Sequence, residues 1–161
     1  MSDGLVHLTR QGQVATIIFD RVAALNSMTE SMYAELVQHC HAISSDRAIR
    51  AVVLRGAGSK AFVAGSDISQ FSAFQGGSAG IRYEKQIDEC VGLIESLRMP
   101  TIAVVHGWAA GGGLLIASAC DFRLGTSEAR FAAPIAATVG NTLSMASMAG
   151  LVNAWGMQRA N

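Results

Sequence analysis

Two glycine-rich stretches decide the fold: Gly56-Ala-Gly-Ser-Lys-Ala-Phe-Val-Ala-Gly-Ser-Asp-Ile68 and His106-Gly-Trp-Ala-Ala-Gly-Gly-Gly113. Each follows an apolar run typical of a buried strand, 51–54 in the first case and 101–105 in the second. Glycine lets a backbone N–H approach a ligand closely, and a helix N-terminus stabilises negative charge. Two such turns can therefore direct two N–H groups at one developing oxyanion, although tight turns alone would also explain the glycines.

The first glycine stretch does not match the common phosphate-binding motifs. A P-loop needs four residues between its first glycine and the Gly-Lys pair, which the stretch beginning at Gly56 lacks. A dinucleotide fingerprint needs a third glycine where Ala61 stands. We therefore do not expect a nucleotide phosphate at this turn.

The remaining chain alternates between strand and helix patterns. Apolar spacing predicts a helix along Met32, Leu36, Cys40 and Ile43, with Ser27 and Glu30 as its capping box. The other predicted segments are strands at 5–10, 14–19, 51–54, 101–105 and 122–124, and helices around 83–97, 114–119 and 141–155. Strands and helices in alternation predict an α/β fold with crossover connections.

Composition excludes several classes of protein. The 161 residues carry 12 basic and 12 acidic side chains, and half of them are hydrophobic, so nothing favours nucleic acid or an anionic membrane as a partner. No apolar run reaches the roughly 18 residues of a membrane span, and the N-terminus does not resemble a signal peptide. We expect a cytoplasmic protein with reduced, buried cysteines and no metal site, since Cys40, Cys90 and Cys120 form no paired motif and the histidines show no zinc spacing.

Several motifs together resemble those of the crotonase (enoyl-CoA hydratase/isomerase) superfamily. Residues 60–68 resemble its AFxAGxD[IL] segment, and 106–113 followed by 117–121 resemble its second signature. Residues 24–29 resemble its LNAxT segment and 130–134 its F-x-x-P region, so the resemblance covers essentially the whole chain. It implies a spiral of ββα units over residues 1–140, with 141–161 beginning a C-terminal helical segment used in trimer assembly. Most of that segment is expected to be absent, because the chain ends where it should begin.

The resemblance also implies a substrate and a site. The substrate would be an acyl- or enoyl-CoA thioester, with coenzyme A as part of the substrate and no separate cofactor. The backbone N–H groups of Ser66 and Gly112 would form the oxyanion hole that stabilises the thioester enolate. The residues expected to line the coenzyme A site are Ala24, Leu25, Ala64, Asp67 and Ile68. Family members assemble as trimers or dimers of trimers, so a homotrimer or hexamer is expected.

One departure from the family pattern concerns the acid–base residues. Hydratases place glutamates at the positions of Leu115 and Ile135, and neither side chain here can move a proton. Hydration of a 2-enoyl-CoA is the default expectation. The alternatives are another crotonase-type reaction (isomerisation, decarboxylation or retro-aldol cleavage) with an unusual base, or a non-catalytic thioester-binding protein.

Other polar residues have a structural interpretation that we favour over a catalytic one. Asp67 and Asp121 are expected to be structural carboxylates, and His106 a packed, hydrogen-bonded histidine. Tyr83, Glu84 and Asp88 are expected on the solvated face of a helix. Beyond Ile135 the sequence contains no Asp, Glu or His, which leaves only Thr138, Asn141, Thr142 and Ser144 to order water or substrate.

Overall fold

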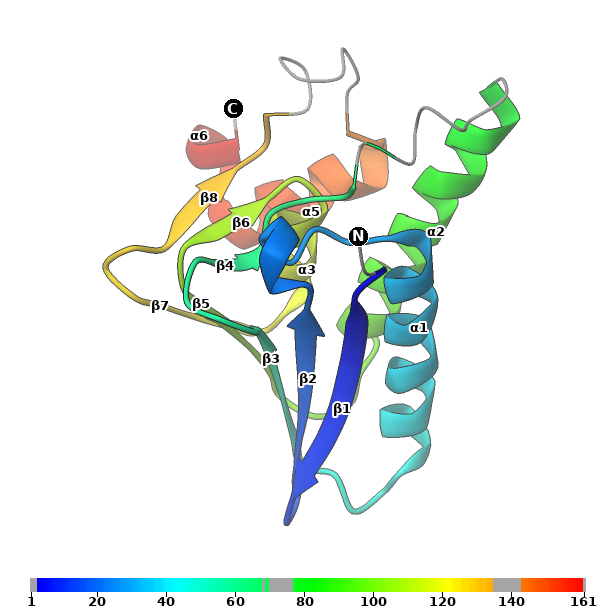
Figure 1. Cartoon of the computed structure of the whole chain (residues 1–161), viewed down its shortest axis with the longest axis vertical. Coiled ribbons are helices and arrows are strands. Elements are labelled where there is room, and N and C mark those ends of the chain that lie inside the picture. The colour runs from blue at the N-terminus through cyan, green and yellow to red at the C-terminus, as the bar shows by residue number, and fades with distance from the viewer. Residues whose placement is uncertain (1–2, 68, 70–76, 135–142, 161) are drawn as a thin grey trace.

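The chain winds through successive units of two strands and a helix (Figure 1). The computed structural model describes residues 3–67, 69, 77–134 and 143–160. In the first unit both strands join a five-stranded sheet. In each later unit the first strand joins that sheet, the second joins a three-stranded sheet, and a helix follows. The predicted α/β spiral of ββα units is therefore confirmed. The predicted division between residues 140 and 141 lies outside the described residues.

The large sheet has the order β1-β2-β3-β5-β7. Strands β1 and β2 form an antiparallel hairpin around Gly12, and all later pairs are parallel. Parallel neighbours need a crossover connection, which the intervening helices supply. The strands are β1 (Leu5–Gln11), β2 (Val14–Asp20), β3 (Ala51–Gly56), β5 (Thr101–Val105) and β7 (Phe122–Gly125).

The small sheet was not predicted from the sequence. It consists of three parallel strands, β4 (Ala61–Val63), β6 (Trp108–Ala110) and β8 (Arg130–Ala132). Each has only three residues, too few to show a period of two, so the first two read as parts of glycine-rich turns. This sheet sets the two glycine stretches side by side, since β4 pairs directly with β6.

Two helix starts differ from the predictions. Thr29, not Ser27, caps the first long helix, because its hydroxyl accepts a hydrogen bond from Met32 N at 3.3 Å while Ser27 contacts Arg21. The last long helix begins at Met145 after its N-cap Ser144. The helices are η1 (Val22–Ala24), α1 (Glu30–Ser45), α2 (Gly77–Glu95), α3 (Gly112–Ala119), α5 (Met145–Trp155) and α6 (Met157–Ala160).

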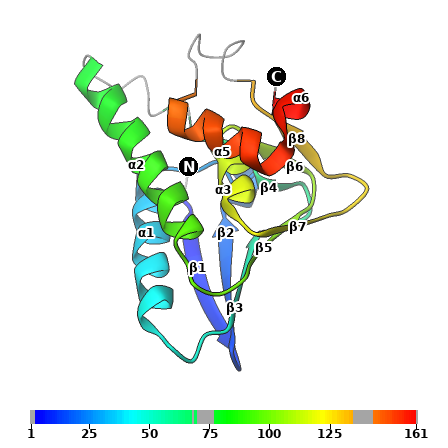
Figure 2. The same cartoon turned by 180° about the vertical axis from the view of Figure 1, so that it is seen from behind.

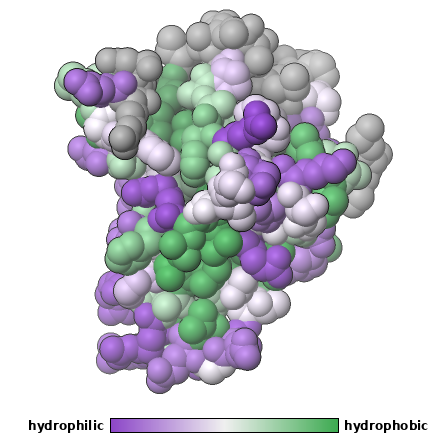
Figure 3. Space-filling view, turned by 90° about the vertical axis from the view of Figure 1, so that its left-hand side faces the viewer, coloured by the Kyte–Doolittle hydropathy of each residue, from purple (hydrophilic) through white to green (hydrophobic). Residues whose placement is uncertain are grey.

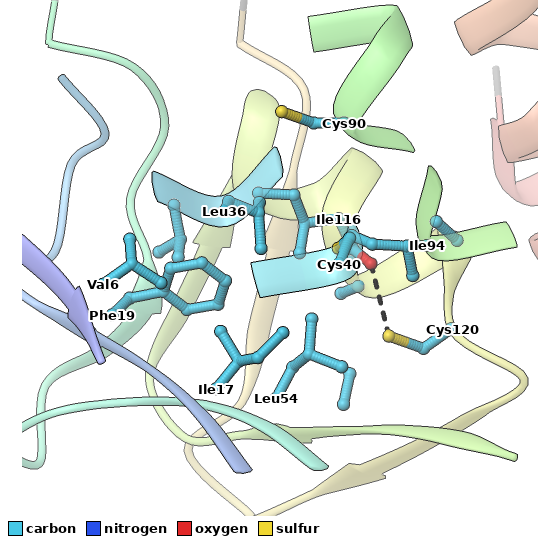
Figure 4. Close-up of a cluster of buried hydrophobic side chains, with 14 of the residues drawn as sticks. Val6, Ile17, Phe19, Leu36, Cys40, Leu54, Cys90, Ile94, Ile116 and Cys120 are labelled. Carbon is cyan, nitrogen blue, oxygen red and sulfur yellow. Dashed lines mark hydrogen bonds between the residues drawn. The ribbon is translucent and has the colours of Figure 1, made fainter. Parts of the chain in front are cut away.

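The main core lies between the large sheet and the helices that cover one of its faces (Figure 2). Alternate residues of β2 and β3, including Ile17, Phe19 and Leu54, are fully buried there. Figure 4 shows them facing side chains of α1, α2 and α3, among them Leu36, Ile94 and Ile116. The alternation of buried and partly exposed positions fixes the register, because a one-residue slip would turn every apolar side chain outward.

The three cysteines belong to this core, as predicted. Cys120 donates to the Ile116 carbonyl at 3.5 Å, the dashed line in Figure 4. Burial raises the pKa of Cys40 to about 11 and those of Cys90 and Cys120 to about 12. These thiols stay protonated near neutral pH, which suits packing rather than nucleophilic chemistry.

Away from the helix-covered core, the edge of the large sheet at β7 leaves apolar side chains exposed. Phe122 and Leu124 of the edge strand β7 are exposed by 58% and 60%. Figure 3 views the molecule from the side on which β7 lies in Figure 1, and it shows a hydrophobic area bordered by hydrophilic side chains. In the part of the chain that the structure describes, no helix is both long and apolar enough to cross a membrane.

Candidate active site

The two glycine stretches meet at the ends of β4 and β6. A Cβ on Gly65 would lie 3.4 Å from the Ala110 carbonyl oxygen, and one on Gly111 would lie 3.8 Å from Gly65 Cα. A Cβ on Gly113 would overlap the Val63 carbonyl. At Gly113, therefore, only glycine allows the start of α3 to approach β4 this closely.

Ser66 and Gly112, the two predicted oxyanion donors, lie next to each other at this junction. Ser66 Oγ is 3.3 Å from the position that a Gly112 Cβ would take. Ser66 forms a parallel bridge with Met28, in which Met28 N donates to Gly65 O and Asp67 N donates to Met28 O, both at 2.8 Å. That bridge therefore does not use the N–H of Ser66 itself.

Both predicted donor N–H groups are without an acceptor among the described residues. Gly112 is the first residue of α3, and an N–H in the first turn of a helix has no intrahelical partner. Gly112 is also buried, so its N–H faces an environment in which a hydrogen bond to a ligand oxygen is worth more than in water. Two neighbouring residues thus each carry an N–H group that no described residue uses.

Asp67 is held by an ion pair and cannot serve as a proton carrier near neutral pH. Its carboxylate lies 2.7 Å from the Arg21 guanidinium, and both side chains are largely buried. Ser69 donates to the same carboxylate from its hydroxyl (2.6 Å) and its N–H (3.0 Å). The Ser69 hydrogen bonds, together with Arg21, lower the pKa of Asp67 below its ordinary value. The structural interpretation of Asp67 fits this geometry.

The segment around Leu25 contacts the first glycine stretch directly. Leu25 and Asn26 both have left-handed backbone angles, with φ of 53° and 57°, and Ala64 N donates to Leu25 O at 3.1 Å. Ala24, the other predicted residue of this segment, is partly buried. Three of the predicted coenzyme A positions, at residues 24, 25 and 64, are thereby brought together, whereas Ile68 lies outside the described residues.

Sequence reasoning assigned no role to Asn26, which holds this segment in place. Its side chain is buried, accepts from Arg21 N at 3.0 Å and donates to the carbonyls of Ala57 and Ala61 at 2.9 Å each. A side-chain amide with two donors and an acceptor can satisfy three backbone groups of two loops at once. The Asn within the 24–29 motif was the available signal, but it does not indicate which carbonyls the amide reaches.

A second group that was missed is a cluster of three hydroxyls beside Gly112. Tyr33 of α1 is fully buried, and its hydroxyl lies 2.8 Å from Ser66 Oγ. Tyr83 of α2 packs edge-on against Tyr33, with ring centroids 6.2 Å apart. Hydrogen bonding to Ser66 and Tyr33 is among the causes that act on the pKa of Tyr83. The spacing of Tyr33 from Leu36 and Cys40 was the signal that places Tyr33 on the buried face of α1.

The two positions where the family has glutamates carry no acid here. Leu115 is 5% exposed and belongs to an apolar cluster with Leu114 and Leu151, which joins α3 to α5. Ile135 lies outside the described residues, as do Thr138, Asn141 and Thr142. The described part of the chain also contains no group of three or more His, Cys, Asp or Glu that could hold a metal ion.

Among the remaining candidates, Asp121 has the expected structural role, whereas Asp88 and His106 depart from the predictions. Asp121 accepts from the N–H and hydroxyl of Thr101 at 2.8 and 3.0 Å, which ties the end of α3 to the start of β5 as expected. Asp88 is not on a solvated face: it accepts from the hydroxyls of Ser144 and Ser147 and joins α2 to α5. His106 differs from the prediction of a hydrogen-bonded side chain, because its buried Nε2 has no partner among the described residues.

Comparison with known proteins identifies similar chains. Residues 9–161 match the family described as enoyl-CoA hydratase/isomerase. The short-chain-enoyl-CoA hydratase of Clostridium acetobutylicum is 39% identical over 132 residues, which cover 80% of this chain and 49% of that protein. The crotonyl-CoA hydratase of Syntrophomonas wolfei is 33% identical over 130 residues, 79% of this chain and 48% of that one. This chain thus spans about half the length of these curated relatives.

A solved structure shares the fold over nearly the whole chain. The enoyl-CoA hydratase/carnithine racemase from Magnetospirillum magneticum superposes with a TM-score of 0.92 at 30% sequence identity. The match covers 99% of this chain and 59% of that structure. The spiral described above is therefore the fold of these proteins.

Proposed function

Because the chain belongs to the enoyl-CoA hydratase/isomerase family of the crotonase superfamily, we propose that it binds an acyl- or enoyl-CoA and stabilises its thioester enolate. The oxyanion would accept from the backbone N–H groups of Ser66 and Gly112. One observation carries the proposal: Ser66 and Gly112, from two different motifs, lie next to each other, and neither backbone N–H has an acceptor among the described residues. Such preorganised donors contribute roughly 3–4 kcal/mol each in other enzymes.

The coenzyme A portion would lie along the segment that joins Leu25 to Ala64. Support comes from the hydrogen bond between Ala64 N and Leu25 O and from the partial exposure of Leu25. Ala24, Asp67 and Ile68 complete the proposed lining. Asp67 would act there by keeping the loop in place through Arg21, because its carboxylate is already fully paired.

The default reaction is hydration of a 2-enoyl-CoA, which makes the chain a lyase. The names of the two hydratases from Clostridium and Syntrophomonas support this assignment. A non-catalytic thioester-binding protein is the second candidate, and a specific observation favours it. Leu115 is packed into an apolar cluster and Asp67 is ion-paired, so the described part of the site offers no free carboxylate to move a proton.

A difference spectrum tests the proposal. Cinnamoyl-CoA has a conjugated thioester whose near-ultraviolet band shifts to the red when its carbonyl is polarised, so the protein should shift the band and free coenzyme A should compete. Ser66→Pro removes the N–H but not the hydrogen bonds of the Met28 bridge, and we expect it to abolish the shift. Ser66→Ala, which keeps the N–H, should retain the shift. An unshifted band with the wild-type protein would refute the proposed site.

We also propose that the chain assembles as a homotrimer or a dimer of trimers. The net charge of zero and the exposed Phe122 and Leu124 support self-association, because both favour contact between copies. Light scattering after size exclusion should give three or six times 16.8 kDa. A monomeric mass at micromolar concentration would contradict this.

A further inference from the structure

The hydroxyls of Tyr33, Ser66 and Tyr83 form a polar cluster directly behind the proposed oxyanion donors. Tyr33 and Ser66 hydrogen-bond at 2.8 Å, and the ring of Tyr83 packs edge-on against that of Tyr33 with centroids 6.2 Å apart. Hydrogen bonding to Ser66 and Tyr33 lowers the pKa of Tyr83, against the larger effect of burial. A Cβ on Gly112 would overlap the Tyr33 hydroxyl, so the absent side chain of Gly112 leaves the room that the cluster occupies. The three residues come from α1, the first glycine stretch and α2, and they meet only in the folded chain.

The tyrosines of this cluster differ in solvent exposure. Tyr33 is fully buried, whereas Tyr83 is partly exposed. Of the two tyrosines, Tyr83 is therefore the one that a ligand can approach from the surface. Each hydroxyl both donates and accepts, so a proton given up by Tyr83 can be replaced without leaving a charge in the core.

Burial keeps both tyrosines protonated. Desolvation raises the pKa of Tyr33 well above its usual range and also raises the pKa of Tyr83, while the hydrogen bonds within the cluster only partly offset it for Tyr83. At neutral pH both side chains are O–H donors. Asp67, by contrast, is ionised and paired with Arg21, and Leu115 is apolar.

We propose that Tyr83 is the proton donor to C2 of the bound enoyl thioester, and that Ser66 and Tyr33 are positioning residues that orient its hydroxyl. The inference rests on the proposed function, because C2 is bonded to the thioester carbon and must lie beside the oxyanion donors. In the step, the oxygen of water bonds to C3, C2 takes the proton of Tyr83, and the Tyr83 oxygen takes the proton that water releases. One water is added across one double bond, and the protein is unchanged at the end.

The test measures polarisation of the bound thioester carbonyl and hydration of the substrate separately. The wild-type protein and four variants are compared: Tyr83→Phe, Tyr33→Phe, Ser66→Ala and the control Ser96→Ala, which removes an exposed hydroxyl one residue beyond α2. The cinnamoyl-CoA shift reports the N–H donors, and the loss of crotonyl-CoA absorbance reports hydration. Thermal unfolding of each variant confirms that it folds.

We expect Tyr83→Phe to keep the spectral shift and to lower kcat by about 100-fold or more, in the range of general acid–base contributions. Tyr33→Phe and Ser66→Ala should lower kcat less, with KM little changed, and Ser66→Thr should restore the rate. Ser96→Ala should match the wild type. A kcat for Tyr83→Phe within about threefold of the wild-type value would refute Tyr83 as the proton donor, because general acid–base catalysis contributes far more than this. It would leave the proposed thioester site standing.

Two further outcomes also overturn the inference. A shift that disappears in Tyr83→Phe would mean that Tyr83 shapes the pocket instead of delivering a proton. A wild-type protein that shifts the band without turnover would leave the thioester site in place and remove the proposed proton donor. A wild-type protein without a shift would refute the site itself, which separates failure of the proposed function from failure of Tyr83.

Discussion

Arg21 and Asp67 form a largely buried ion pair with a nitrogen–oxygen distance of 2.7 Å and side chains exposed by only 9% and 16%. Arg21 precedes η1 and Asp67 lies near the end of the first glycine stretch, so the pair joins two segments that are distant in the sequence. Arg21 also hydrogen-bonds to the Ser27 hydroxyl at 3.0 Å. The loop that carries Ser66 is therefore fixed from outside the site.

Removing one partner of this pair should destabilise the protein. Arg21→Ala leaves the Asp67 carboxylate buried without its cation, and we expect a loss of about 3 kcal/mol in the free energy of unfolding, at the lower end for buried pairs. Arg10→Ala is the matched control, because the Arg10–Asp46 pair is 2.6 Å long but more than a third exposed. It should cost less than about 1 kcal/mol in urea unfolding. Equal losses in the two variants would contradict the structural role of the buried pair.

The lowered pKa of Asp67 predicts a contribution to acid sensitivity. Its folded pKa is below its unfolded value, so the contribution to stability is present above the unfolded pKa of about 3.9 and is lost as pH falls through the folded pKa. Asp67→Asn removes this titration. We expect wild-type stability to fall more steeply than that of the variant as pH drops below about 5. Parallel pH profiles would show that Asp67 titrates normally.

Gly113 should tolerate no side chain, because its Cβ would overlap the Val63 carbonyl. Gly113→Ala should lower the free energy of unfolding by about 3 kcal/mol, since backbone on both sides must shift. Gly92→Ala is the control: Gly92 lies in α2 with no atom within 4 Å of its Cβ position, and alanine there should stabilise by about 0.5–1 kcal/mol. Thermal melts of both variants give the comparison, and a neutral Gly113→Ala would contradict the close approach of α3 to β4.

The elements that the sequence predicts well are those with long periodic patterns. Helix α1 and the strands that contribute Ile17 and Leu54 follow from apolar spacing alone. Strands β4, β6 and β8 do not, because three residues carry no period and their pairing depends on the path of the whole chain. Tyr33 and Asn26 were missed for a related reason: their hydrogen-bond partners lie 33 and 35 positions away, and no local pattern reveals them.

Asp88 should hold α5 against α2. It accepts from Ser144 and Ser147 at 3.1 and 3.2 Å, and Ser144 is the N-cap of α5. Asp88→Ala should lower stability by about 1–2 kcal/mol, since it leaves the buried Ser147 hydroxyl without its acceptor. It should also change the fluorescence of Trp155, whose Nε1 donates to Ser118 Oγ at 2.8 Å from the end of α5. Glu89→Ala, at an exposed position of the same helix, should leave both observables unchanged. Unaltered fluorescence in Asp88→Ala would mean that apolar contacts around Leu151 hold α5 without the serines.

Placing glutamates at positions 115 and 135 tests whether a working thioester site lacks only the usual acids. Leu115→Glu alone puts a carboxylate into the cluster with Leu114 and Leu151, so we expect lower stability than in Leu115→Met, which keeps the volume and polarity of the site. Leu115→Glu/Ile135→Glu should raise the hydration rate by at least about 100-fold over the matched glutamine pair, which has the same shape but cannot exchange a proton. The assay is the loss of crotonyl-CoA absorbance. Equal rates in the glutamate and glutamine pairs would show that protonation of the substrate does not pass through these positions.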